Sequence, residues 1–196
     1  MSESIPVAER LSAVKPSATV AVAQRARELK AQGIDVLSFS VGEPDFDTPE
    51  YIREAAKKAI DAGATRYTAA RGVPELRQAI CDVSAQRRKG VTYTPAECMV
   101  SVGAKHTLFN LALALYDPGD EVLIPAPYWV SYPEQVRLAG ANPVIVQTSE
   151  ADGFRMTPEA LRTAITPKTK ALILCSPSNP TGAAYSGEQL RALADV

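Results

Sequence analysis

Cysteine, histidine and tryptophan are scarce in this chain of 196 residues, which contains three, one and one of them. The cysteines, Cys81, Cys98 and Cys175, are widely spaced and form no Cys-x-x-Cys pair, which argues against a zinc site and a disulfide framework. We therefore expect three buried or half-buried thiols in a cytoplasmic protein. The single histidine, His106, is expected to pack or to lie at the surface, and we assign it no role.

The sequence also lacks an excess of charge of either sign and lacks long apolar runs. Its formal net charge is -1, so it carries no electrostatic footprint for nucleic acid or for an anionic membrane. No apolar run approaches the length that spans a bilayer, and the first residues do not have the basic-then-apolar pattern of a secretory signal. We expect neither a nucleic-acid partner nor a membrane partner.

From residue 97 onward, short apolar runs alternate with segments of helical spacing. Strands are predicted at 98–102, 121–125, 143–147 and 169–175, and helices at 104–116, 128–139, 158–165 and 187–196. Alternation of this kind implies parallel strands joined by right-handed crossovers. The predicted fold class is α/β, a three-layer, doubly wound and mainly parallel sheet.

The first half of the chain is less regular. Helices are predicted at 20–32, 49–62 and 73–88, a strand at 34–41, and an arm over residues 1–16 that needs a partner to become ordered. We predict two parts: residues 1–41, an arm and a segment of a smaller domain, and residues 42–196, the large domain.

The turn Ser-Pro-Ser-Asn-Pro-Thr-Gly at 176–182 follows the apolar run 171–175. Pro177 and Pro180 fix the backbone on either side of Asn179, at the carboxyl end of a predicted parallel strand. Open α/β sheets bind their ligands at that end. An ordinary strand-to-helix turn is the alternative, and spacing alone favours it.

Two other predicted strands end in residues that could bind a ligand. Gly103, Ala104 and Lys105 follow the strand at 98–102, and amides at a helix N-terminus suit an anion such as phosphate. The segment matches neither the nucleoside-triphosphate loop nor the dinucleotide loop. Trp129 follows the strand at 121–125, where its ring could contact a ligand. The alternative is that Trp129 packs in the hydrophobic core.

The motif at 176–182 resembles the S-x-x-N-P-T-G turn of class I aminotransferases, the pyridoxal-phosphate enzymes of fold type I. Three further segments resemble parts of that family: G-E-P-D-F from Gly42, Y-x-x-x-x-G from Tyr67, and P-x-Y-W ending at Trp129. The segment 15–19 resembles the arm of the bacterial gamma-type aspartate aminotransferases, some of which also transaminate prephenate.

The resemblance implies pyridoxal 5'-phosphate as cofactor and a role for each matching residue. The amides of Gly103, Ala104 and Lys105 would hold the phosphate, the Trp129 ring would stack on the pyridine ring, and the Asn179 amide would bond the phenolic oxygen. Tyr67 would reach the cofactor of a neighbouring subunit, which implies a homodimer. The implied substrate-binding residues are Gly42, Trp129, Asn179, Lys15 and Ser17.

The implied activity is transamination between an L-amino acid, aspartate or glutamate, and a 2-oxo acid. Family members are considerably longer, and the Schiff-base lysine is expected beyond Val196, because Lys168 and Lys170 do not resemble its setting. We therefore expect no catalytic residue in this chain. We also expect that the chain is an N-terminal portion of a longer protein and is inactive by itself. The alternatives are an amino-acid lyase or synthase of the same fold, or a non-catalytic aminotransferase-like fragment or regulator domain.

Overall fold

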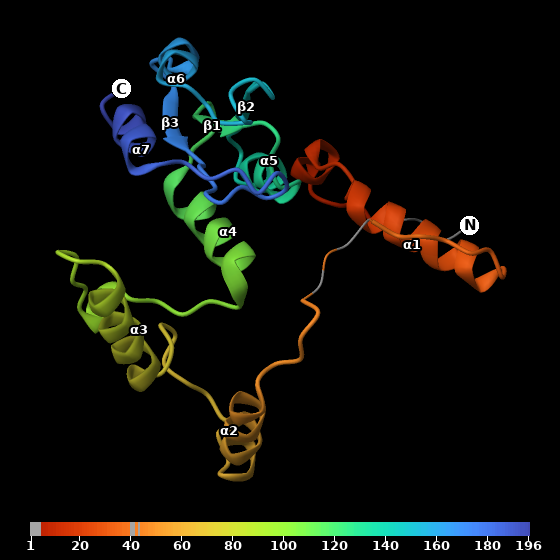
Figure 1. Cartoon of the computed structure of the whole chain (residues 1–196), viewed down its shortest axis with the longest axis vertical. Helices are drawn as coiled ribbons and strands as arrows, with labels where there is room; N and C mark the ends of the chain where they lie inside the picture. The colour runs from red at the N-terminus through yellow and green to blue at the C-terminus, as the bar shows by residue number, and fades with distance from the viewer. Residues whose placement is uncertain (1–4, 40–41, 43) are drawn as a thin grey trace. The chain divides into compact units, whose positions relative to one another are not determined.

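The computed structural model describes residues 5–39, 42 and 44–196 (Figure 1). Its internal contacts divide the chain into two compact units. One unit combines the residues up to 21 with residues 105–196, and the other consists of residues 22–104. The division between residues 41 and 42 made from the sequence stays a prediction.

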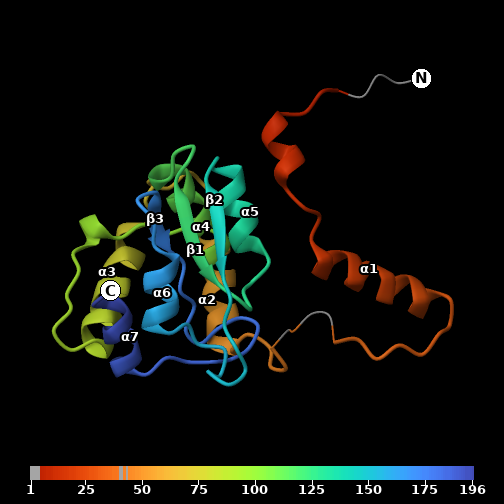
Figure 2. The same cartoon turned by 90° about the horizontal axis from the view of Figure 1, so that it is seen from above.

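A parallel sheet of three strands lies at the centre of the first unit. Its strands are β1 (Glu121–Pro125), β2 (Asn142–Val146) and β3 (Thr169–Leu172), in the order β2-β1-β3 (Figure 2). All three were predicted from the sequence, and both pairings are parallel as expected. β3 ends three residues earlier than predicted, although the Ile173 amide still donates to the Leu123 carbonyl at 2.9 Å.

Alternate residues of β1 point to opposite faces of the sheet, and each face has its own apolar cluster. Val122 and Ile124 pack with Val136 on one face, whereas Leu123 packs with Leu161 and Leu193 on the other. The covering helices are α4 (Gly103–Leu115), α5 (Ser131–Leu138), α6 (Pro158–Ala164) and α7 (Gly187–Ala194). Because helices cover both faces, the predicted three-layer α/β architecture is confirmed.

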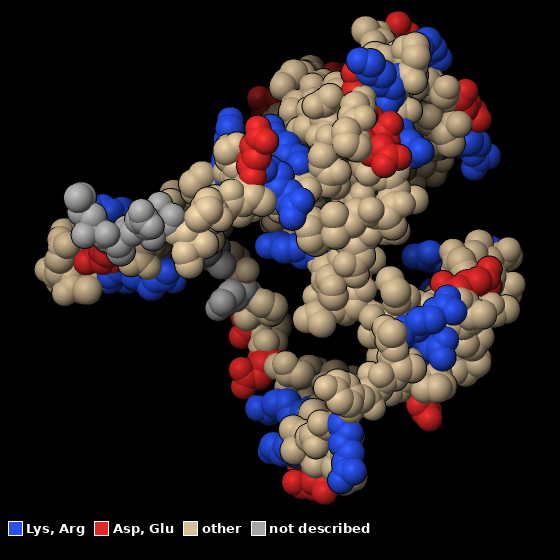
Figure 3. All heavy atoms as spheres, turned by 180° about the vertical axis from the view of Figure 1, so that it is seen from behind, with Lys and Arg blue, Asp and Glu red and all other residues tan. Residues whose placement is uncertain are grey.

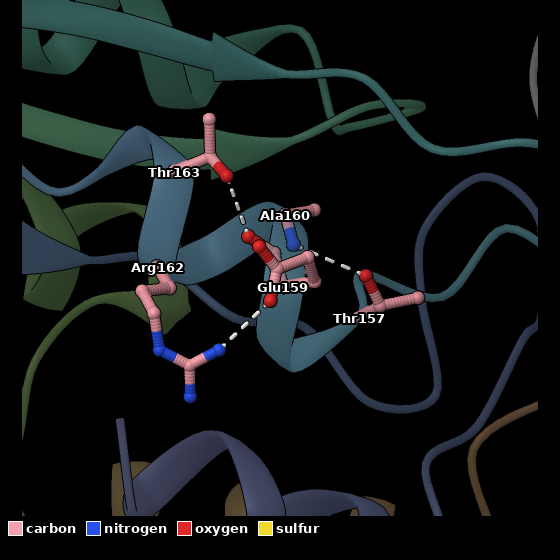
Figure 4. Close-up of polar contacts among 5 residues, drawn as sticks. All are labelled: Thr157, Glu159, Ala160, Arg162 and Thr163. Atoms are coloured by element: carbon pink, nitrogen blue, oxygen red, sulfur yellow. Dashed lines mark hydrogen bonds and ion pairs between the residues drawn. The ribbon is translucent and has the colours of Figure 1, made fainter.

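The ends of the helices follow from local chemistry. At the start of α6 the Ala160 amide donates to Thr157 Oγ1 at 3.1 Å, while Glu159 pairs with Arg162 at 2.9 Å (Figure 4). Ser186 caps α7 in the same way. Such caps satisfy amides that the helix itself leaves unpaired, and for this reason the predicted starts of these two helices agree with the structure.

The three other α-helices, α1 (Ala18–Ala31), α2 (Glu50–Asp61) and α3 (Pro74–Arg87), were also predicted. The short 3-10 helices η1 (Glu9–Ala13) and η2 (Pro95–Glu97) were not predicted. Gly33, with φ 80°, follows α1, and this left-handed conformation is the one that a helix end favours in glycine.

Two predicted strands are wrong for the residues that the structure describes. Residues 98–102 form no strand, and the Val100 amide donates to the Arg71 carbonyl at 3.1 Å instead of to a neighbouring strand. Residues 34–39 form none either, while residues 40–41 of that prediction lie outside the described residues. An apolar run becomes a strand only when a partner strand accepts its hydrogen bonds, and in neither segment does the structure pair it with one.

Acidic and basic side chains are interspersed on the face shown in Figure 3. Within the described ranges, no helix combines the length and the apolar character needed to cross a membrane.

Leu123→Ala should destabilise the first unit by about 2–5 kcal/mol, because it opens a cavity at a side chain that is 0% exposed. Leu113→Ala on α4, where the side chain is 57% exposed, should cost less than about 0.5 kcal/mol. Urea unfolding followed by the fluorescence of Trp129, which belongs to the same unit, measures both. Equal losses in the two variants would contradict the assignment of Leu123 to the core.

Candidate active site

An aromatic pair lies at the start of α5 and in the segment that leads into it. The ring of Trp129 meets that of Tyr132 edge-on, with centroids 5.5 Å apart and an interplanar angle of 82°. The Lys105 ammonium lies 4.7 Å from the centroid of the Trp129 ring, within the range of a cation–π interaction. The structure therefore brings together two predicted site residues, Lys105 and Trp129.

A cavity of about 530 Å³ opens beside this pair. Its lining includes Lys15 from the arm, Ser17 just before α1, Lys105 from α4, and Trp129. The volume is that of a site for a small molecule. Two lysines beside an apolar and aromatic wall suit a ligand that carries carboxylate groups, because an ammonium group attracts them as a compact charge.

Glu134 on α5 fastens the arm to this cavity. Its Oε2 accepts a hydrogen bond from the Lys15 amide at 3.0 Å, while its Oε1 lies 2.6 Å from Arg137 Nη1. The side chains of Arg137 and Glu134 are 28% and 20% exposed, so water screens their pairing less than that of a surface ion pair. Glu134 was not predicted from the sequence. The only pattern in the sequence that could have indicated it is the spacing of Glu134 and Arg137, three residues apart on a predicted helix.

Gln135 joins α5 to the first turn of α4. Its side chain is buried, and its Nε2 donates to the Lys105 carbonyl at 2.8 Å. Its Oε1 is also buried and has no hydrogen-bond partner among the described residues. Gln135 thus holds in place the backbone that carries the Lys105 side chain to the cavity.

Asn179 lies by a second, much smaller cavity, whose lining includes Tyr128, Tyr132 and Cys175. Tyr128 lines both cavities, so the cavity that Asn179 lines and the cavity that Trp129 lines share one aromatic residue. The turn that carries Asn179 is closed by a hydrogen bond from the Ser178 amide to the Ala183 carbonyl at 2.8 Å.

Tyr132 lies in the apolar cluster on one face of the sheet. Burial, together with a hydrogen bond to Cys175, raises the pKa of Tyr132 to about 12. The phenol of Tyr132 is therefore neutral at physiological pH, and no negative charge from it faces the small cavity.

The other predicted site residues belong to the second unit and are described by themselves. Gly103 starts α4 with φ 78°, and a Cβ on it would meet nothing within 4 Å. Its amide donates to the Ser101 carbonyl at 2.9 Å, and Ala104 follows in the first helical turn. The loop before it is not the end of a strand, which corrects the expectation of three successive strand ends. Tyr67 is fully exposed, and Gly42 has open space where a Cβ would be.

Known proteins of similar sequence and structure identify the family. The family model described as aminotransferase class I and II matches residues 34–196. The chain belongs to the class I and II aminotransferase family. Members of this family use pyridoxal phosphate.

Aminotransferases of known name resemble the chain over nearly its whole length. It is 55% identical over 97% of its residues to an aspartate/prephenate aminotransferase of Cereibacter sphaeroides, and 53% identical over 97% to an aspartate aminotransferase of Geobacillus stearothermophilus. It covers 47% and 48% of those proteins. The chain therefore spans about half the length of the curated relatives it matches.

A solved aminotransferase has the same fold. The structure of aspartate aminotransferase from Thermus thermophilus with maleate matches with a TM-score of 0.93 and 51% sequence identity. The match covers 98% of this chain and 50% of that one. The fold class predicted from the sequence is thereby confirmed a second time.

Glu134→Ala should release the arm from α5. Loss of a hydrogen bond to a carboxylate should speed hydrogen exchange of the Lys15 amide about tenfold, as measured by NMR. Glu159→Ala is the matched control, because it also removes a glutamate that pairs with an arginine three residues ahead on a helix. Exchange at Lys15 that does not change in the Glu134 variant would show that this bond does not hold the arm.

Proposed function

We propose that this chain supplies part of the cofactor and substrate site of a pyridoxal-phosphate-dependent aminotransferase. The reaction would move an amino group between aspartate or glutamate and a 2-oxo acid, with prephenate as a further amino acceptor. The observation that carries the proposal is the cavity beside Trp129, where two lysines adjoin an aromatic wall in a chain of this family. The expectation that the chain is inactive by itself stays a prediction.

The residues present suit three parts of the cofactor: its phosphate, the face of its ring and the oxygen at the ring edge. The first-turn amides at Ala104 and Lys105, at the start of α4, suit its phosphate, and open space above Gly103 leaves room for it. The indole of Trp129 offers an aromatic face, and the amide of Asn179 can donate to an oxygen at the ring edge. When bound, the cofactor supplies an electron sink for a bond at the substrate's Cα.

The substrate proposal rests on charge and shape. Lys15 and Lys105 would attract the distal carboxylate of a dicarboxylic amino acid, and Ser17 would add a hydroxyl that can donate a hydrogen bond. The Thermus relative was solved with maleate, itself a dicarboxylate, which supports this class of ligand. We further propose that Gly42, together with Asn179, lies near the substrate's α-carboxylate.

The assembly and the location of the protein belong to the same proposal. The exposure of Tyr67 supports a homodimer in which this side chain reaches the site of the neighbouring subunit. We keep the division into an arm with a small-domain segment, 1–41, and a large domain, 42–196. Three free thiols suit the reducing conditions of the cytoplasm.

The natural gene product, with its intact mass measured first, tests the proposed function. It should bind added pyridoxal phosphate, give a band that borohydride fixes covalently, and transfer the amino group of aspartate to 2-oxoglutarate. Binding without transfer would point to a lyase, a synthase or a regulator of the same fold. A protein that neither binds the cofactor nor transfers the amino group would refute the proposal.

Asn179→Ala should weaken binding of pyridoxal phosphate about tenfold, since one hydrogen bond to a charged oxygen is lost. Asn142→Ala is the matched control, because Asn142 is exposed at the start of β2 and should change the dissociation constant less than about twofold. A spectrophotometric titration of the natural gene product measures both. Equal affinities in the two variants would remove Asn179 from the proposed site.

A further inference from the structure

Two of the three cysteines lie side by side in the second unit, and neither has a role in the proposed function. Cys81 on α3 and Cys98, just after η2, have their sulfur atoms 3.4 Å apart. Both are free thiols in the structure. The sulfur atoms of a disulfide are about 2.0 Å apart, so these two need to approach each other by about 1.4 Å.

The backbone around this pair is already fixed. The side chain of Arg77 on α3 donates to the Pro95 carbonyl at 2.9 Å, and the Arg71 guanidinium donates to the Ala96 carbonyl. Thr94 and Glu97 cap η2 reciprocally. The Arg77 bond therefore holds the segment 94–98 against α3 without involving sulfur, and the other two contacts fix the backbone of the segment itself.

The two thiols differ in access. Cys81 is 4% exposed, whereas Cys98 is half-buried. Burial, the hydrogen bond with Cys98 and nearby negative charge raise the pKa of the Cys81 thiol, so at neutral pH it is a thiol rather than a thiolate. An oxidant from solution therefore meets Cys98 first.

We propose that Cys81 and Cys98 form a redox-active thiol pair that closes to a disulfide when the protein meets a hydroperoxide. The Cys98 thiolate attacks one peroxide oxygen and becomes a sulfenic acid as the O–O bond breaks. The other oxygen takes up the proton that the Cys98 thiol released and leaves as water or an alcohol. Cys81 then attacks that sulfur, forms the S–S bond and releases water. Two thiols lose two electrons in total, and the hydroperoxide gains them.

The cross-link would tie α3 to the segment that leads into α4. Cys98 stands five positions before Gly103 in the sequence, and Gly72 already packs closely against Val100 on the same segment. A covalent bond here therefore reduces the freedom of the chain that enters the proposed phosphate loop. This consequence rests on the proposed function, whereas the formation of the bond does not.

Intact-mass spectrometry of the whole chain after mild hydrogen peroxide tests the proposal without an activity assay. The number of thiols that react with a thiol reagent should fall from three to one, and the mass of the chain should decrease by two hydrogen atoms. Trypsin, which cleaves at the exposed residues Arg87–Lys89, should leave the Cys81 and Cys98 peptides joined until dithiothreitol separates them.

Variants assign the step to each thiol. Cys175→Ser is the matched control and should still form the cross-link. Cys81→Ser should leave Cys98 as a sulfenic acid that dimedone traps, and Cys98→Ser should keep its two remaining thiols. If a variant fails to fold, the mass and peptide measurements on the wild-type chain still test whether the cross-link forms. Oxidation of Cys98 to a sulfinic acid while Cys81 stays a thiol, a bond to Cys175, or three unchanged thiols would each overturn the proposal.

Discussion

The burial of β1 between two layers of helices is the constraint on which the described site depends. Val122, Leu123 and Ile124 are all fully buried, and each needs an apolar neighbour on its own face of the sheet. Because β1 is paired on both sides, its carboxyl end is fixed in position. The residues that follow, up to Trp129, inherit that position, and parallel sheets place their ligands at this end.

The rest of the cavity is assembled by polar side chains of α5. Glu134 holds the arm through the Lys15 amide, and Gln135 holds the first turn of α4 through the Lys105 carbonyl. Two lysines that are 90 positions apart in the sequence thus line the same cavity. A single helix serves as the common support, so the spacing of the two ammonium groups depends on the packing of α5 against the sheet.

Much of the fold could be predicted from the sequence, because its causes are local. The turns Asp-Pro-Gly-Asp at 117–120 and Pro-Ser-Asn-Pro at 177–180 bound short apolar runs, and helices begin where Thr157 and Ser186 can cap them. The predictions failed at 98–102 and 34–39, where apolar residues alternate or cluster but the structure provides no neighbouring strand. Strand formation depends on a partner that is distant in the sequence, and a pattern within one segment cannot report it.

The candidate site divides in the same way. By itself, the sequence pointed to the family through the motifs that end at Trp129 and run through Asn179, because the residue types of several separate motifs together resemble that family. Only the tertiary structure placed Lys105 over the Trp129 ring, joined Glu134 to the arm and brought Cys81 next to Cys98. The physical reason is that motifs are set along the chain, whereas hydrogen bonds, cation–π contacts and thiol pairs depend on distances that packing alone decides.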